Sequence, residues 1–223
     1  MADPDQNDDT AAASSVVEAA GTATAHATAT ATATVRRNFS IPHLHAAEHF
    51  AEQLRLHEEK YAGAGWGPHF DFCSWNASAA IILSFSAIEA AVDEAEDDLA
   101  LPTELSDALD RSPTLEHAQA LLAHRGSPTF DKGAEPFQSA ELLRALRNGL
   151  VHPKAEWDNA RDRNRQLSRK ILGARLGLSP FQQDPDLAFP HGCMSAEVAS
   201  WTASSARQFI RELRSRLGLR RSA

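Results

Sequence analysis

An arginine, an asparagine and a histidine lie close together near the middle of the chain, within the stretch ELLRALRNGLVHPKAEW. An arginine and a titratable histidine can hold and protonate the oxygens of a phosphodiester, which is general acid chemistry that needs no metal. The asparagine adds a hydrogen-bonding group that can position the backbone or the scissile group. The candidate catalytic residues are therefore Arg147, Asn148 and His152.

The same stretch predicts the helix that carries these side chains. Four leucines recur at helical spacing and make an apolar stripe, and two arginines fall on the opposite side. Pro153 lacks a backbone donor and disfavours helical geometry for His152, so we expect the helix to end at about Val151 or His152. The leucines are Leu142, Leu143, Leu146 and Leu150, and the arginines are Arg144 and Arg147.

An earlier apolar helix is expected to support the motif helix. It runs from about Ser74 to Asp98, and its apolar and small side chains predict a central position in a bundle. Glu89 lies beside the apolar stripe, and a carboxylate in such an environment needs a partner, for which Arg144 or Arg147 is available. Such a pair would fix the packing of the two helices and would also orient the motif arginine.

The motif and its supporting helix together resemble a known family. Arg147-Asn148-x-x-x-His152 resembles the Arg-x(4 to 6)-His motif of the HEPN superfamily, all-helical domains that often act as RNases. The segment SFSAIEAA, residues 84–91, looks like the Ser/Ala-x-Glu helix that packs beside the motif helix in that superfamily. The resemblance covers roughly residues 38–217.

The resemblance implies a metal-independent endoribonuclease that works without a cofactor. In the superfamily two chains pair so that their motif helices face one another, and an RNA 2'-hydroxyl attacks the adjacent phosphate to leave a cyclic phosphate. RNA and a second copy of this chain are the implied partners. His152 would act as general acid or base, Arg147 would stabilise the phosphorane charge, and Asn148 would position the scissile group. Arg147 and His152 are about 140° apart on an ideal helix, so they converge only if the helix end unwinds or a second chain contributes.

One position departs from part of the family. Toxins of this superfamily that are silenced by a nucleotidyltransferase partner often carry a tyrosine two residues beyond the motif histidine, and Lys154 stands there in this chain. The departure weakens a toxin–antitoxin role and favours a stand-alone or defence-associated role.

Two lines of arginines are candidate RNA-binding surfaces. The first lies on a helix expected from about Trp157 to Leu176, and the second lies on a last helix that Ser195 would cap and that ends at about Leu217. Taken alone, each line is typical of a solvated helix face. The first line is Arg161, Arg165 and Arg169, and the second is Arg207, Arg211 and Arg214.

Two alternatives to the ribonuclease stay open. Many HEPN-like domains bind RNA, nucleotides or another protein without cutting, and Arg147 would then only pair with Glu89 while His152 capped the helix. A metal-dependent enzyme would instead use an H-x-x-E-H pattern or an acidic run, but no third ligand can be singled out and we expect no metal. The pattern is His45, Glu48 and His49, and the acidic run is Asp93, Glu94, Asp97 and Asp98.

Length and composition fit one domain with an extension. The chain has 223 residues, of which 43% are hydrophobic and 23% charged. Residues 1–35 are acidic and then rich in Ala and Thr, without the basic and leucine-rich regions of a signal peptide, which predicts a disordered extension before a HEPN-like helical domain at 36–223. Residues 1–34 carry -5 of the formal charge of -8, so the near-balanced remainder does not argue against an RNA partner.

The remaining features indicate a cytoplasmic all-α protein. The two cysteines, Cys73 and Cys193, have neither metal-ligand nor redox spacing, which suits a reducing compartment. The most apolar window, Ala79 to Val92, is too short for a bilayer span, so we expect a core helix and no membrane. Strand-like alternation is missing from the part expected to fold. We therefore predict a single bundle of five to seven helices, with His117 and His124 on its surface.

Overall fold

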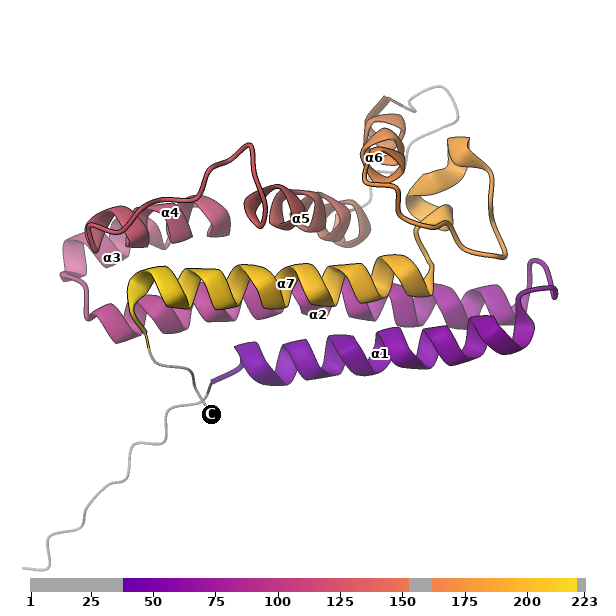
Figure 1. Ribbon diagram of the computed structural model, residues 1–223, viewed down its shortest axis with the longest axis horizontal. Helices are drawn as coiled ribbons and strands as arrows, with labels where there is room; N and C mark the ends of the chain where they lie inside the picture. The colour runs from indigo at the N-terminus through magenta and orange to yellow at the C-terminus, as the bar shows by residue number, and fades with distance from the viewer. Residues whose placement is uncertain (1–37, 153–161, 220–223) are drawn as a thin grey trace, which may run out of the picture. The chain divides into compact units, whose positions relative to one another are not determined.

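The computed structural model describes residues 38–152 and 162–219, and these residues form helices and no strand (Figure 1). The prediction of an all-α bundle of five to seven helices is confirmed, because the described residues contain seven α-helices. They are α1 (Ser40–Tyr61), α2 (Pro68–Leu99), α3 (Thr103–Leu109), α4 (Thr114–His124), α5 (Phe137–Val151), α6 (Asp162–Gly173) and α7 (Ala196–Leu217).

Some predictions fall on other parts of the chain. The predicted disordered extension, residues 1–35, lies outside the described residues, as do Pro153, Lys154 and Arg161. Contacts divide the chain into two units, Met1–Arg36 and Arg37–Ala223. All the structural features that follow belong to the second unit.

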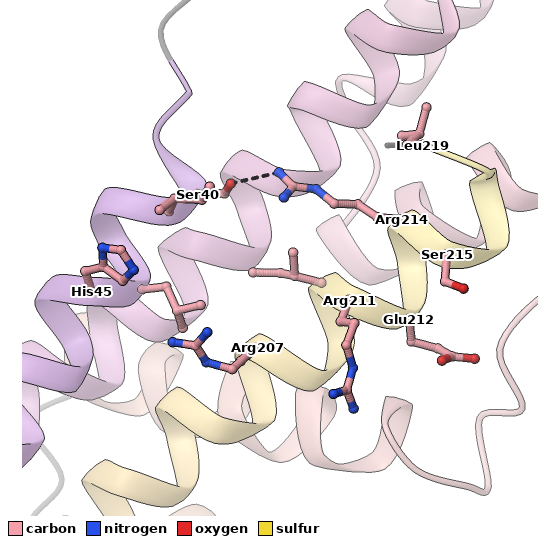
Figure 2. A pocket seen from close by; sticks show the side chains of 11 residues that line it. Ser40, His45, Arg207, Arg211, Glu212, Arg214, Ser215 and Leu219 are labelled. Atoms are coloured by element: carbon pink, nitrogen blue, oxygen red, sulfur yellow. Dashed lines mark hydrogen bonds between the residues drawn. The ribbon is translucent and has the colours of Figure 1, made fainter. Parts of the chain in front are cut away.

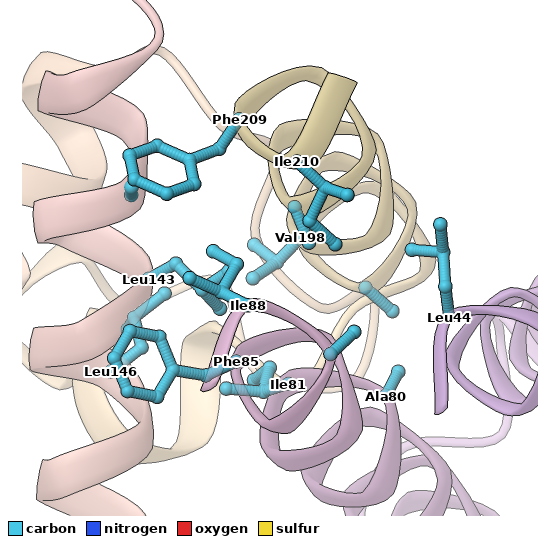
Figure 3. Packing of buried hydrophobic residues seen from close by; sticks show 14 of the residues in the cluster. Leu44, Ala80, Ile81, Phe85, Ile88, Leu143, Leu146, Val198, Phe209 and Ile210 are labelled. Atoms are coloured by element: carbon cyan, nitrogen blue, oxygen red, sulfur yellow. The ribbon is translucent and has the colours of Figure 1, made fainter. Parts of the chain in front are cut away.

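The apolar core of this unit is built around α2, as its sequence predicts. α2 packs against α1, α4, α5 and α7, and α1 runs beside it in the opposite direction (Figure 1). Figure 3 shows Phe85 and Ile88 of α2 directed toward Leu143 and Leu146 of α5, and all four side chains are buried. By length and composition, α2 is the one helix of the described residues that could cross a membrane; 56% of its apolar window is buried. Packing in the core accounts for this apolar character.

Proline and glycine set most helix ends. α3 and α4 each begin directly after a proline, Pro102 and Pro113. α7 is capped by Ser195, whose hydroxyl accepts a hydrogen bond from the Val198 N–H, and ends at Gly218 in left-handed geometry, which confirms the predicted last helix. The prediction for α2 was wrong at its start, because the helix begins at Pro68, and its first turns bury Phe70 and Cys73.

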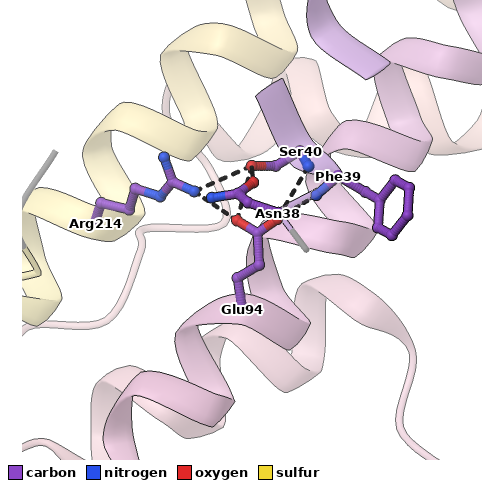
Figure 4. Close-up of polar contacts among 5 residues, drawn as sticks. All are labelled: Asn38, Phe39, Ser40, Glu94 and Arg214. Atoms are coloured by element: carbon purple, nitrogen blue, oxygen red, sulfur yellow. Dashed lines mark hydrogen bonds and ion pairs between the residues drawn. The ribbon is translucent and has the colours of Figure 1, made fainter. Parts of the chain in front are cut away.

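A buried polar network ties the start of α1 to α2 and α7 (Figure 4). The Glu94 carboxylate of α2 accepts hydrogen bonds from the backbone N–H groups of Phe39 and Ser40 and from the Ser40 hydroxyl. Arg214 of α7 donates to the same carboxylate at 2.7 Å and to the Ser40 hydroxyl at 3.0 Å. A side-chain carboxylate thus satisfies the free N–H groups at the first turn of α1. Glu94 is 8% exposed, so this member of the acidic run is buried and does not belong to a solvated helix end.

The end of α5 is fixed by a close approach that only glycine permits. A Cβ at Gly149 would lie 2.6 Å from Phe189 Cζ and 3.3 Å from Leu167 Cδ2 of α6. Phe189 has an extended backbone, with φ -122° and ψ 136°, and lies in the kinked turn Ala188–Gly192 that follows a 3-10 turn, Pro185–Leu187. The last turn of α5, which carries the motif, therefore rests against α6 and this turn.

Candidate functional site

The three motif residues occupy the last turn of α5 and the position directly after it. α5 ends at Val151, as Pro153 predicts, and His152 follows with φ -119° and ψ 57°, outside helical geometry. The His152 N–H still bonds to the Asn148 carbonyl oxygen at 3.1 Å. The imidazole is exposed, so a substrate can reach it. The predicted stop of the helix at its histidine is confirmed.

Arg147 is held from two sides. Its Nη1 donates to Asn148 Oδ1 at 3.1 Å, and its Nη2 donates to Glu89 Oε1 of α2 at 3.4 Å. The guanidinium carbon lies 5.8 Å from the centre of the Phe85 ring. Arg147 Nε is buried and has no hydrogen-bond partner in the described part of the chain. The prediction that Glu89 pairs with a motif-helix arginine is confirmed, and the arginine is Arg147.

The Glu89 carboxyl sits in a mixed environment that weakens its acidity. Burial raises its pKa, the positive charge of Arg147 opposes this increase, the nearby Asp93 raises the pKa further, and His43 lowers it. His43 belongs to α1, so the motif cluster receives contributions from three helices. The pair with Arg147 is long and partly open, with 23% of the arginine and 34% of the glutamate side chain exposed.

Arg144, the other predicted supporting residue, is not part of this cluster. Its Nη2 pairs with Glu141 of the same helix at 2.7 Å, and its Nε is buried without a partner among the described residues. The two arginines are three positions apart, which corresponds to a rotation of about 300° around the helix axis, so they leave α5 in different directions. Only Arg147 reaches Glu89.

The first predicted basic line lies on α6. Arg165 and Arg169 are one turn apart and both are exposed, whereas Arg161 lies outside the described residues. Leu167 and Ile171 of the same helix are buried, so α6 presents Arg165 and Arg169 on the side opposite the core. Exposure leaves both guanidinium groups able to contact phosphates.

The second basic line borders a groove between α1 and α7 (Figure 2). Arg207 pairs with Glu48 of α1, and Arg214 is engaged by Glu94 and Ser40, so neither guanidinium is free of partners. No ion pair or hydrogen bond engages Arg211 within residues 38–152 and 162–219. The three arginines recur periodically in the sequence, but they lie in three different environments, because each of them meets a different neighbour.

The histidine pattern considered for a metal lies on α1, and the acidic run lies at the end of α2. His45 and His49 are exposed, while Glu48 pairs with Arg207. Across the described residues, no group of three or more His, Cys, Asp or Glu side chains is arranged to hold a metal ion.

The prediction that His117 lies on the surface is wrong, because this residue is 5% exposed and its Nε2 lies 2.9 Å from Glu96 Oε2.

Sequence reasoning also missed the Glu94 network. Ser40, Glu94 and Arg214 are far apart in the chain, and no local spacing signals their contact.

Comparisons with protein-family models, with curated proteins and with solved structures find no match for this chain.

Proposed function

We propose that this chain is a HEPN-like, metal-independent endoribonuclease whose active site is formed by Arg147, Asn148 and His152. The observation that carries the proposal is the presence of three side chains where α5 ends. Arg147 and Asn148 are held in position by hydrogen bonds, and His152 is exposed. These are the groups that phosphodiester transesterification needs: a proton carrier, a cation for the developing negative charge and a polar positioner.

In the proposed reaction the RNA 2'-oxygen forms a bond to the adjacent phosphorus and the bond from phosphorus to the 5'-oxygen breaks. A base accepts the proton of the 2'-hydroxyl, and an acid donates a proton to the leaving 5'-oxygen. His152 performs one of these transfers, and Arg147 neutralises charge on the phosphorane oxygens. Glu89 acts as a positioning residue, because it holds one side of the Arg147 guanidinium.

The exposed His152 of one chain can perform one proton transfer, and the reaction needs two. α5 stays helical as far as Val151, so Arg147 and His152 point in different directions from the helix axis. We propose that a second copy of the chain completes the site in a homodimer. The exposed Arg165 and Arg169 of α6 are proposed to contact the RNA backbone.

Cleavage of a mixed RNA pool in EDTA tests the proposal. The wild-type chain is expected to produce fragments with 2',3'-cyclic phosphate ends, and His152→Ala is expected to lose this activity at an unchanged melting temperature. His124→Ala is the matched control, since His124 is an exposed histidine at the end of another helix, α4. Equal cleavage by wild type and His152→Ala would refute the assignment.

A non-catalytic binding module is the competing function. The Arg147–Glu89 pair favours it, because this contact alone would explain the motif arginine as a packing residue. In that case the chain would bind RNA or another ligand without cutting, and both histidine variants would behave as the wild type. The same assay, followed by RNA retention on the protein, separates the two functions.

A further inference from the structure

The groove between α1 and α7 has the size and lining of a ligand site. Its volume is about 850 Å³, within the range of pockets that hold one small molecule. Its wall carries Arg207, Arg211 and Arg214 from α7 and His45 from α1 (Figure 2). Its apolar lining comes from Ile41, Leu44, Ile210 and Leu219.

The groove is separate from the motif cluster. His45 lines the groove, whereas His43 lies close enough to Glu89 for its charge to act on that carboxyl. Residues two positions apart on a helix are about 200° apart around its axis, so the two histidines leave α1 on opposite sides. A ligand in the groove would therefore not contact Arg147 or Glu89, and its binding does not rest on the proposed ribonuclease activity.

The three arginines of the groove differ in how freely they can bind a ligand. Arg214 is a fixed part of the wall, because its side chain is 15% exposed and bonded to Glu94 and Ser40. Arg211 is exposed and meets no acidic partner in the described ranges. Arg207 is 53% exposed, and its pair with Glu48 is a surface ion pair of the kind that contributes little stability and exchanges readily.

The chemistry of these groups indicates the ligand. Arg207 and Arg211 are one helical turn apart and both line the groove, and Figure 2 shows their side chains leaving α7 in different directions. Both are exposed, so each can turn toward a ligand that carries two anionic groups. Guanidinium forks match phosphate oxygens in bidentate pairs, and the acidic Glu212 in the lining is already engaged by Arg216 at 3.0 Å. We propose that the α1–α7 groove binds a small organic diphosphate, with its phosphoryl groups on Arg211 and Arg207 and its organic part on the apolar lining.

Calorimetric titration of the full-length chain with pyrophosphate tests the site. Arg211→Ala is expected to weaken binding by about tenfold or more, because it removes the one guanidinium without a competing carboxylate. Glu48→Ala is expected to strengthen binding by about threefold or more, because it frees Arg207 from its partner. Arg169→Ala is the matched control, an exposed arginine on α6 away from the groove, and should bind as the wild type does.

Each alternative outcome overturns the proposal. Absence of binding at about 10 mM pyrophosphate would show that the groove is not a diphosphate site. An equal loss in Arg211→Ala and Arg169→Ala would indicate non-specific attraction to surface charge. Displacement of pyrophosphate by a short oligouridylate of much higher affinity would assign the groove to nucleic acid instead. Melting temperatures of the variants identify any that fail to fold, and Arg211→Lys, which keeps the charge, should retain part of the affinity.

Discussion

Two glutamates that lie five residues apart on α2 each pair with an arginine of another helix, and the two pairs are built differently. Glu94 and Arg214 are 2.7 Å apart with 10% and 15% of their side chains exposed, and three further hydrogen bonds reach the carboxylate from the start of α1. Glu89 and Arg147 are 3.4 Å apart and more exposed. The Glu94–Arg214 pair is a structural contact in which hydrogen bonds from α1 and α7 converge on one carboxylate of α2. The Glu89–Arg147 pair holds an arginine in position and leaves part of it accessible.

Breaking the buried pair should have the largest effect. Glu94→Ala leaves Arg214 as an uncompensated buried charge and leaves two N–H groups of the α1 start without their acceptor. We expect a loss of about 3–5 kcal/mol in the free energy of unfolding, measured by urea denaturation. A loss below about 1 kcal/mol would contradict the structural role of this network.

A third carboxylate, Glu58, shows what happens without an arginine. It accepts a hydrogen bond from the Ala196 N–H at 3.0 Å, and burial together with the nearby Glu197 raises its pKa to about 7. The folded chain therefore holds this proton more tightly than the unfolded chain, so the contribution to stability is complete below the usual carboxyl pKa and is lost as pH rises through about 7.

The pH dependence of unfolding measures this effect. We expect the wild type to lose about 2 kcal/mol of stability between about pH 5 and pH 8 from this group, and Glu58→Gln to remove that part of the slope. A slope unchanged by Glu58→Gln would assign the pH dependence to other groups. Glu59→Gln is the control, because Glu59 is exposed and lies next to Glu58.

The smallest stability effect should come from the motif pair. Burial raises the pKa of Glu89, so its charged form is not favoured by the fold, and Glu89→Gln should change the free energy of unfolding by less than about 1 kcal/mol at neutral pH. Cleavage should fall, since the amide holds Arg147 less firmly. A destabilisation as large as that of Glu94→Ala would show that the two pairs are equivalent.

Local sequence signals predicted the helices well and the polar contacts unevenly. Pro113 and Pro153 mark the start of α4 and the end of α5, because proline limits backbone geometry wherever it occurs. The Glu89 partner was predictable because Glu89 lies beside the apolar stripe of α2, and α5 offers only two cations, Arg144 and Arg147. The Glu94 junction joins residues up to 174 positions apart, so no periodicity could indicate it.

The arginine lines show why periodicity alone did not define the candidate site. Arg207 and Arg214 share a helix face with Arg211, yet two of the three meet acidic partners on α1 and α2. His117 fits a polar surface position by sequence but is buried against Glu96, since α4 packs on α2. A one-dimensional pattern gives the direction of a side chain and not the residue that it meets.

The most direct test of the central claim compares stability and catalysis in Arg147→Gln. If Arg147 serves the reaction, cleavage should fall by about 100-fold or more while the free energy of unfolding changes by less than about 1 kcal/mol. Arg144→Gln, on the same helix but paired only with Glu141, should keep wild-type cleavage. A fall in stability as large as that of Glu94→Ala, or cleavage equal to the wild type, would show that the Arg147–Glu89 pair is a packing contact and not part of an active site.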